Sequence, residues 1–202
     1  QIIATEGDLR KSKVKAAAER VKKINSAVVV TSINKTINSQ TVTGFIRNAG
    51  VVLDGLDNFM TRQIVANACN KLKIPFVHGA IAGFCGQLMT ILPGDKGLKA
   101  ICDISGTESG CGVETLTGNP AATPAVIAAW EVQEAIKIIT GIGNLIRDRL
   151  IFLDFLDNTF DQISLSFPAE QSSPFQRKKV SPDFDSKDEG HKKRAESKTR
   201  LV

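Results

Sequence analysis

The spacing of hydrophobic residues changes several times along this chain, as is typical of alternating helices and strands. Apolar side chains recur at helical spacing in SKVKAAAERVKKI, where Ser12 is placed to cap the first turn. Similar periods stop before Pro75 and at Gly141, two residues that end helices. Helices are therefore predicted over residues 12–24, 41–49, 58–72 and 120–140.

Short apolar runs rich in β-branched residues separate these helices. The run VVLD at 51–54 has no polar alternation, as expected of a strand that is covered on both faces. Strands are predicted over 27–33, 51–54, 75–80, 86–92, 149–155 and 162–167, and residues 93–119 are expected to be irregular. The order of elements predicts an α/β protein with a Rossmann-like, mostly parallel sheet, helices on both faces and antiparallel C-terminal strands.

The chain has 202 residues, of which 42% are hydrophobic, so one domain with a sizeable core is expected over residues 1–167. No apolar run reaches the roughly 18 residues of a membrane span, and no signal peptide opens the sequence. A cytoplasmic protein without membrane contact is the expectation.

The segment 168–202 has few apolar residues and no periodicity, which predicts a disordered charged tail. It holds nine Lys or Arg against six Asp or Glu, hence three of the five net positive charges. Mixed charges without interleaved aromatic residues favour a solvated tail over a nucleic-acid arm, so no nucleic-acid partner is expected.

The four cysteines, Cys69, Cys85, Cys102 and Cys111, stand singly, and there is no CxxC pair. Neither a disulfide scaffold nor a zinc site is expected, and reduced thiols are the default. Cys69 and Cys85 occupy apolar positions and are predicted to be small core residues. Cys111 has no nearby histidine or basic cluster, so we interpret it as an incidental loop cysteine.

Polar residues gather where the strand at 51–54 stops, in the stretch VVLDGLDNFMTR. Ligands of open α/β sheets bind outside the carboxyl ends of the strands, where Asp54, Asp57 and Asn58 lie. Helix capping by Asp57 or Asn58 explains one polar residue, but not two carboxylates flanking Gly55, which permits a tight turn. The pattern favours a ligand site. His78, at a strand end, is predicted to be a structural histidine with satisfied partners.

The stretch VVLDGLDNFMTRQIVANACNKLKIPFVHGAIAGFCGQL resembles the central signature of the ThiF/MoeB/HesA family, relatives of the ubiquitin-activating enzymes. That signature is a strand, D-x-x-D-N-x-x-x-R, a helix, a proline-containing strand and G-x-x-G-x-x-G-Q. Residues 1–25 and 122–143 resemble the family's preceding segment and its late helix. The matching signature residues are Asp54, Asp57, Asn58, Arg62, Pro75, Gly79, Gly83, Gly86 and Gln87.

The resemblance implies an adenylyltransferase that uses ATP and Mg²⁺. Asp57 matches the family aspartate associated with Mg·ATP, and Lys13 matches the lysine that approaches the triphosphate; both are implied catalytic and cofactor-binding residues. Without the resemblance, Lys13 is one more solvated lysine on a basic helix. Asn58 is expected to orient the loop. Arg62 either reaches the nucleotide or only anchors that loop.

The resemblance also implies the partners. The substrate is the C-terminal glycine of a ubiquitin-like sulfur-carrier protein, in molybdopterin or thiamine biosynthesis, and a sulfur donor completes the sequence of reactions. A homodimer is implied by the resemblance alone.

Three departures from the family pattern are visible. The first strand, its glycine-rich nucleotide loop and an Asn/Arg pair, which in the family precede the position of Gln1, are missing, so adenylation is expected of a longer protein. The two zinc-binding CxxC pairs of many relatives are absent. Arg10 stands where relatives often have glycine, which bears on the placement of Lys13.

Other functions stay open at this point. One is a non-catalytic module that dimerises or binds a carrier. Another is the tRNA-modifying dehydratase branch of the same family, for which the basic helix at 10–23 is a candidate surface. An NAD(P) oxidoreductase would need an upstream glycine fingerprint and an acidic residue about twenty residues later, and Asp57 lies in the wrong element for that.

Overall fold

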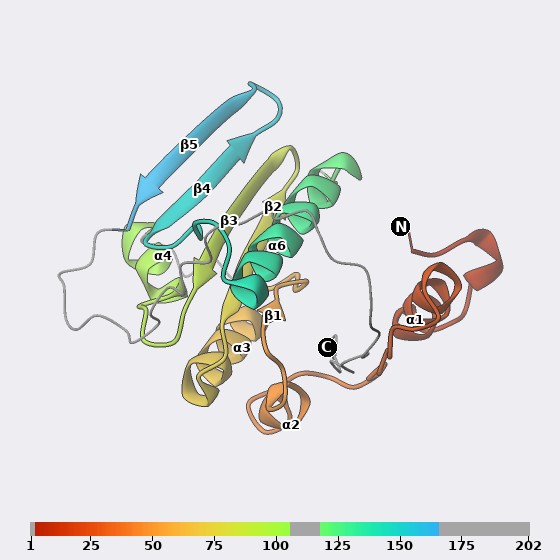
Figure 1. Ribbon diagram of the computed structural model, residues 1–202. Coiled ribbons are helices and arrows are strands. Elements are labelled where there is room, and N and C mark those ends of the chain that lie inside the picture. The colour runs from red at the N-terminus through yellow and green to blue at the C-terminus, as the bar shows by residue number, and fades with distance from the viewer. Residues whose placement is uncertain (1–2, 106–117, 166–202) are drawn as a thin grey trace, which may run out of the picture.

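The structure is a computed structural model that describes residues 3–105 and 118–165, with side chains described outside 102–105 (Figure 1). Its helices are η1 (Glu6–Asp8), α1 (Lys13–Ile24), α2 (Val42–Ile46), α3 (Phe59–Leu72), α4 (Leu98–Ser105) and α6 (Ala122–Thr140). Its strands are β1 (Val52–Leu53), β2 (Phe76–Ala82), β3 (Cys85–Ile91), β4 (Arg149–Asp154) and β5 (Thr159–Ser164).

The five strands form one sheet in the order β1-β2-β3-β4-β5. Strand β1 runs parallel to β2, with Val52 opposite Phe76, and α3 makes the crossover between them. The pairs β2–β3, β3–β4 and β4–β5 are antiparallel, so the prediction of antiparallel C-terminal strands is confirmed. Gly83 lies in the tight turn from β2 to β3 at a φ of 57°.

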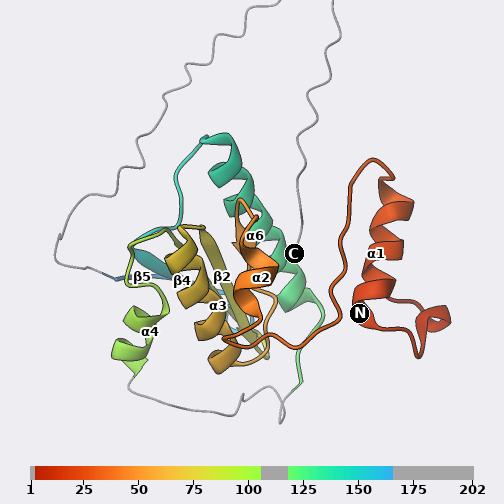
Figure 2. The same ribbon diagram turned by 90° about the horizontal axis from the view of Figure 1, so that it is seen from below.

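Helices cover both faces of the sheet, as predicted (Figures 1 and 2). On one face, α3 and α4 pack their apolar residues against Phe76 and Met89. On the other, Ile127 of α6 packs against Val77 and Leu88, whose side chains are fully buried. Neighbouring strand residues point to opposite faces, so β2 and β3 contribute to two separate apolar clusters.

Buried polar contacts fix α6 on the sheet. Glu134 is completely buried and accepts hydrogen bonds from Thr90 Oγ1 of β3 (2.6 Å) and from the Ile146 N–H (2.8 Å). Lys137, one turn further along α6, pairs with the same carboxylate. Because a buried carboxylate is tolerated only when it is paired and hydrogen-bonded, these contacts define how α6 lies across the strands.

Two predicted elements were wrong. Residues 27–33 form no strand; only Val30 takes part in an isolated bridge. Helix α4 lies in the segment 93–119 that was expected to be irregular, and it buries Leu98 and Ala100 against the core. Because β2–β3 is antiparallel, as are the C-terminal pairs, the sheet is mixed rather than mostly parallel; β1–β2 is the parallel pair among the described strands.

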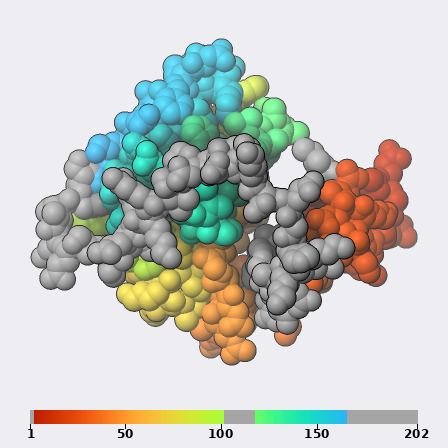
Figure 3. Space-filling view, in the orientation of Figure 1, coloured from red at the N-terminus to blue at the C-terminus, as the bar shows by residue number. Residues whose placement is uncertain are grey.

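Helix α1 lies to one side of the sheet and its covering helices (Figures 1 and 3). A groove of about 500 Å³ separates it from β1; Val14, Val30, Val42 and Val52 are among its lining residues. No helix in the described ranges is long and apolar enough to cross a membrane. The predicted tail at 168–202 lies outside the described residues.

Candidate functional site

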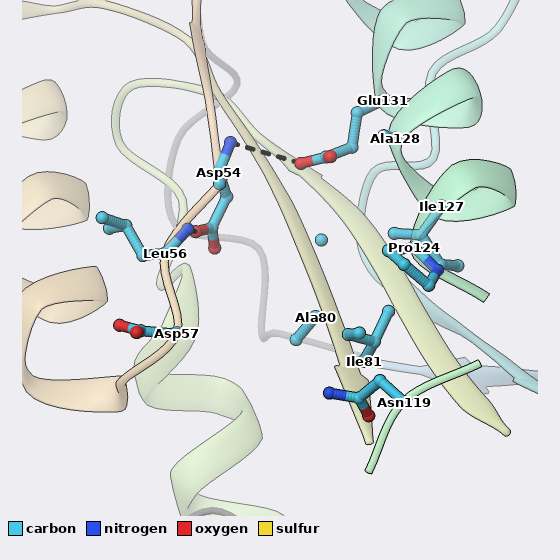
Figure 4. Close-up of a pocket in the computed structure, with 12 residues that line it drawn as sticks. Asp54, Leu56, Asp57, Ala80, Ile81, Asn119, Pro124, Ile127, Ala128 and Glu131 are labelled. Carbon is cyan, nitrogen blue, oxygen red and sulfur yellow. Dashed lines mark hydrogen bonds between the residues drawn. The ribbon is translucent and has the colours of Figure 1, made fainter. Parts of the chain in front are cut away.

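A pocket of about 310 Å³ opens at the carboxyl end of β1, between the following loop and the first half of α6 (Figure 4). The loop supplies Asp54 to Asp57, β2 supplies the wall formed by Gly79, Ala80 and Ile81, and α6 closes the other side. Helix α6 contributes Pro124, Ile127, Ala128 and Glu131 to the lining, and Asn119 lines the pocket from the segment that precedes this helix.

Asp54 is the centre of the hydrogen bonds around this pocket. Its buried carboxylate accepts from Arg62 Nε at 2.6 Å and from His78 Nδ1 at 2.7 Å, both at Oδ2. Its other oxygen accepts from the Leu56 N–H at 3.1 Å, and this contact closes the turn that begins at Gly55. The carboxylate is therefore fully used within the protein and is unavailable to a ligand.

Arg62 lies on the first turns of α3 and is 9% exposed. Besides Asp54, it donates from Nη2 to the Leu56 carbonyl at 2.5 Å. Both contacts hold the loop between β1 and α3. Of the two roles left open for Arg62, loop anchoring is the one that these contacts display.

His78 is 1% exposed and both of its ring nitrogens have partners. Because a carboxylate only accepts, Nδ1–H donates to Asp54 and Nε2 accepts from the Gln87 amide at 3.2 Å. Burial lowers the pKa of His78, which keeps this neutral form. The prediction of a structural histidine is confirmed.

Asp57 and Asn58 form the end of the loop. Asn58 is the N-cap of α3 and accepts from the Thr61 N–H at 2.8 Å through Oδ1, while its side-chain amide donates to Asp57 at 3.1 Å. Asp57 is exposed and lines the pocket (Figure 4). Asn58 thus orients both the helix start and the carboxylate beside it.

Glu131, which no motif of the sequence singled out, faces Asp54 across the top of the pocket (Figure 4). It is 6% exposed, and its Oε1 accepts from the Asp54 N–H at 3.2 Å. Burial, with the nearby charge of Asp54, raises the pKa of Glu131 to about 8. The available signal was a carboxylate one turn after Ile127 on the apolar, buried face of a helix.

Lys13 and Asp57 are not brought together among the described contacts. Lys13 is the first residue of α1, is exposed, and does not line the pocket of Asp57. Three residues earlier, Arg10 takes a φ of 71°, a left-handed conformation that suits glycine. The departure noted at Arg10 is therefore a non-glycine residue in a glycine-type conformation.

The cysteines differ in burial. Cys69 is 1% exposed in the core, and burial raises its pKa to about 12, as fits an inert thiol. Cys85 was expected in the core but is only partly buried, because it begins β3 directly after the turn of the β2–β3 hairpin. The Cys102 side chain and Cys111 lie outside the described residues.

The carboxylates at the pocket suit a metal ion that is held partly by a ligand rather than by the protein alone. Within 3–101 and 118–165, no group of three His, Cys, Asp or Glu side chains is arranged to hold an ion. Asp57 offers one accessible carboxylate, whereas the Asp54 carboxylate is occupied. Mg²⁺ is commonly held by one or two carboxylates together with substrate phosphates, so Asp57 fits an ion that arrives with a nucleotide.

Comparison with known proteins gives one consistent result. The SAMP-activating enzyme E1 of Haloferax volcanii is 29% identical over 166 residues, which are 81% of this chain and 60% of that protein. The sulfur carrier protein ThiS adenylyltransferase of Bacillus subtilis is 34% identical, over 70% of this chain and 42% of that protein. The chain thus spans about half the length of these relatives.

Solved structures agree on the fold. Escherichia coli MccB with ATP superimposes with a TM-score of 0.66 at 16% identity, covering 82% of this chain and 51% of that one. The model of the ThiF family matches residues 1–174, most of the chain. Together with the strand-end loop and its D-x-x-D-N motif, this match shows that the chain belongs to the ThiF family.

Proposed function

We propose that this chain is part of an ATP-dependent adenylyltransferase that activates the C-terminal glycine of a ubiquitin-like sulfur-carrier protein. The names of its relatives support this substrate class, since they include adenylyltransferases of sulfur carriers and a SAMP-activating enzyme. Because the chain spans about half of those proteins, the proposed activity is that of a protein of their length, to which this chain would contribute the loop and the pocket.

One observation carries the proposal: the loop after β1 presents the exposed carboxylate of Asp57 to the pocket. The other carboxylate of that loop, Asp54, is already neutralised by Arg62. A polyanionic nucleotide needs a site that adds no uncompensated negative charge apart from a metal ligand. The arrangement meets that need. When bound with ATP, Mg²⁺ would neutralise phosphate charge next to Asp57.

The reaction follows from these parts. A carboxylate oxygen of the carrier's terminal glycine attacks the α-phosphorus of ATP, and the bond from that phosphorus to the bridging oxygen of pyrophosphate breaks. The products are an acyl-adenylate and pyrophosphate. A sulfur donor then attacks the acyl carbon and releases AMP. Positioning and charge neutralisation account for most of the acceleration of such transfers, and Asn58 and Arg62 serve positioning here.

The proposal assigns Lys13 to the triphosphate and Asp57 to the metal. Lys13 supplies a compact charge on a flexible stem, which suits a phosphate oxygen. Helix α1 lies across a groove from β1. This role therefore requires Lys13 to lie closer to the loop after β1 when the nucleotide is bound.

We also propose that the protein forms a homodimer. Helix α6 exposes an apolar stripe of Val132, Ile136 and Ile139, which are 46%, 46% and 64% exposed at helical spacing. Substituting Ile139 by Glu should yield monomers in light-scattering measurements. The same change at Ile24, 74% exposed on α1, is the matched control and should leave the mass unchanged.

The test of the function is carrier-dependent exchange of pyrophosphate into ATP, measured on the full-length protein. Asp57→Asn should reduce the exchange by about 100-fold or more, because the metal ligand is lost while size and loop contacts are kept. Asp161→Asn, which removes an exposed carboxylate on β5, is the control and should retain wild-type exchange. Exchange that survives Asp57→Asn within about threefold would remove Asp57 from the mechanism.

A further inference from the structure

Glu131 makes one contact that joins elements far apart in the sequence. It lies on the middle of α6, and its Oε1 accepts from the N–H of Asp54, 77 positions earlier in the chain. The same N–H also donates to the Val77 carbonyl of β2 at 3.0 Å. Glu131 thus adds a third element to the hydrogen bond that joins β1 to β2.

The position of the Glu131 side chain is tightly fixed. It lies directly over Gly79 of β2, where an added Cβ would come within 2.7 Å of its Cδ atom. On the same side, a Cβ added at Gly79 would come within 2.9 Å of Ile127 Cγ2. The carboxyl group therefore has little freedom to move away from the Asp54 amide.

What Glu131 holds is the start of the loop that carries Asp57. The Asp54 amide is bound by Glu131, and the Asp54 carboxylate is bound by the Leu56 N–H and by Arg62. Asp54 is therefore fixed at backbone and side chain alike, Leu56 is held at its N–H, and Asp57 follows directly. A displacement of Asp54 would be passed to Asp57 through only two residues, Gly55 and Leu56.

We propose that Glu131 is a positioning residue, whose carboxyl group holds the Asp54 amide and thereby sets where the Asp57 carboxylate lies in the pocket. The inference rests on the proposed function for its consequence on nucleotide binding, but the Glu131–Asp54 link can be tested without any nucleotide.

The charge of Glu131 matters to this role. The ionisable groups that act on it are Asp54 at the end of β1 and Arg62 from α3, while His78 of β2 is bonded to the same Asp54 carboxylate. The Asp54–Arg62 ion pair leaves little net positive charge to compensate a second carboxylate. Uncharged Glu131 keeps the amide contact without adding negative charge to the pocket wall. Once ionised, it would repel both the Asp54 carboxylate and the phosphates of a nucleotide.

The first arm of the test follows the ¹⁵N–¹H resonance of the Asp54 amide between pH 6 and pH 10 in the full-length protein. In the wild type and in the control variant Glu6→Gln, this resonance should titrate with a midpoint near the Glu131 pKa of about 8. In Glu131→Gln, which keeps the accepting oxygen but does not titrate, the resonance should stay at its low-pH position. A resonance that does not move in the wild type, or that moves equally in Glu131→Gln, would overturn the proposal.

The second arm measures binding of Mg·ATP by calorimetry. Glu131→Leu should weaken binding about tenfold through misplacement of Asp57, whereas Glu131→Gln should restore the affinity at pH 7 to within about threefold. At pH 9 the wild type should bind less tightly than Glu131→Gln. Equal affinity of all three proteins at both pH values would refute the positioning role.

The two arms separate the two proposals. A wild-type protein that binds no ATP at any pH would end the proposed function, and the resonance of the Asp54 amide would then decide the role of Glu131 alone. If Glu131→Leu does not fold, the comparison of the wild type with Glu131→Gln still decides both arms.

Discussion

Gly79 and Glu131 are in contact so closely that a Cβ atom at Gly79 would lie 2.7 Å from Cδ of Glu131. Real Cβ atoms do not come this near to another heavy atom, so the absence of a side chain at this position is what lets α6 rest on β2. The pocket, the buried carboxyl group and the strand-end loop all depend on this close approach.

Replacing Gly79 by Ala should therefore lower the free energy of unfolding by about 1–3 kcal/mol, because overpacking forces α6 away from β2. Chemical denaturation measures this change. Gly50→Ala is the matched control, since a Cβ there would meet nothing within 4 Å, and it should change stability by less than about 0.5 kcal/mol. Equal effects of the two substitutions would contradict the close packing at Gly79.

Replacing Arg62 by Met should destabilise the protein by about 3–5 kcal/mol, because the buried Asp54 carboxylate loses its charged partner. Arg20→Met, at an exposed position of α1, is the control and should have little effect. An Arg62 variant that keeps wild-type stability but loses nucleotide affinity would instead favour the nucleotide-binding role that the sequence left open.

Much of this fold was predictable because local patterns of apolar residues in the sequence indicate its helices and strands. The helices at 59–72 and 122–140 bury residues at helical spacing, and the helix at 13–24 turns apolar residues of the same spacing toward the groove beside β1. The ends of these helices coincide with Ser12, Asn58 and Gly141. Most strands were also predictable, because a short, continuous apolar run in an α/β chain is typical of a strand that is buried on both faces.

The errors have physical causes that single-sequence patterns do not contain. Residues 27–33 have the β-branched composition of a strand, but a strand needs a neighbour, and β1 pairs only with β2 among the described strands. Helix α4 follows Pro93, Gly94 and Gly97, which suggested a loop, yet Leu98 and Ala100 gain enough burial to form a helix there.

The candidate site was predictable in part. The exposed residues Asp57 and Asn58 follow directly from a strand-end motif. The link from Asp54 to Glu131 spans 77 positions, so no spacing rule could pair them. That Asp54, rather than Asp57, is the buried carboxylate depends on Arg62 and His78 converging from two other elements.

Stability should fall as pH rises from about 5 to about 8, on account of Glu131. Its pKa in the folded protein is about 8 against an ordinary 4.5, so the folded state holds a proton that the unfolded state has already lost. The stabilisation is fully present below pH 4.5 and is lost as pH rises through 8. The lowered pKa of His78 has the opposite effect on stability: below pH 6.5, stability falls as pH falls.

The measurement is the free energy of unfolding of the wild type relative to Glu131→Gln, which should decrease by about 2 kcal/mol between pH 6 and pH 8. Glu6→Gln, at an exposed position, should show no such drift relative to the wild type. A constant difference between the wild type and Glu131→Gln across this range would mean that Glu131 ionises normally in the folded protein.

One substitution should have opposite effects at two lysines of the α3 C-terminus. Lys73 caps this helix at a φ of 60°, a left-handed conformation that costs a non-glycine residue about 1 kcal/mol. Lys73→Gly should therefore stabilise the protein by up to about 1 kcal/mol. Lys71 is an exposed residue inside the same helix, and Lys71→Gly should destabilise it by about 1 kcal/mol. Denaturation midpoints that move in the same direction for both variants would show that Lys73 carries no backbone strain.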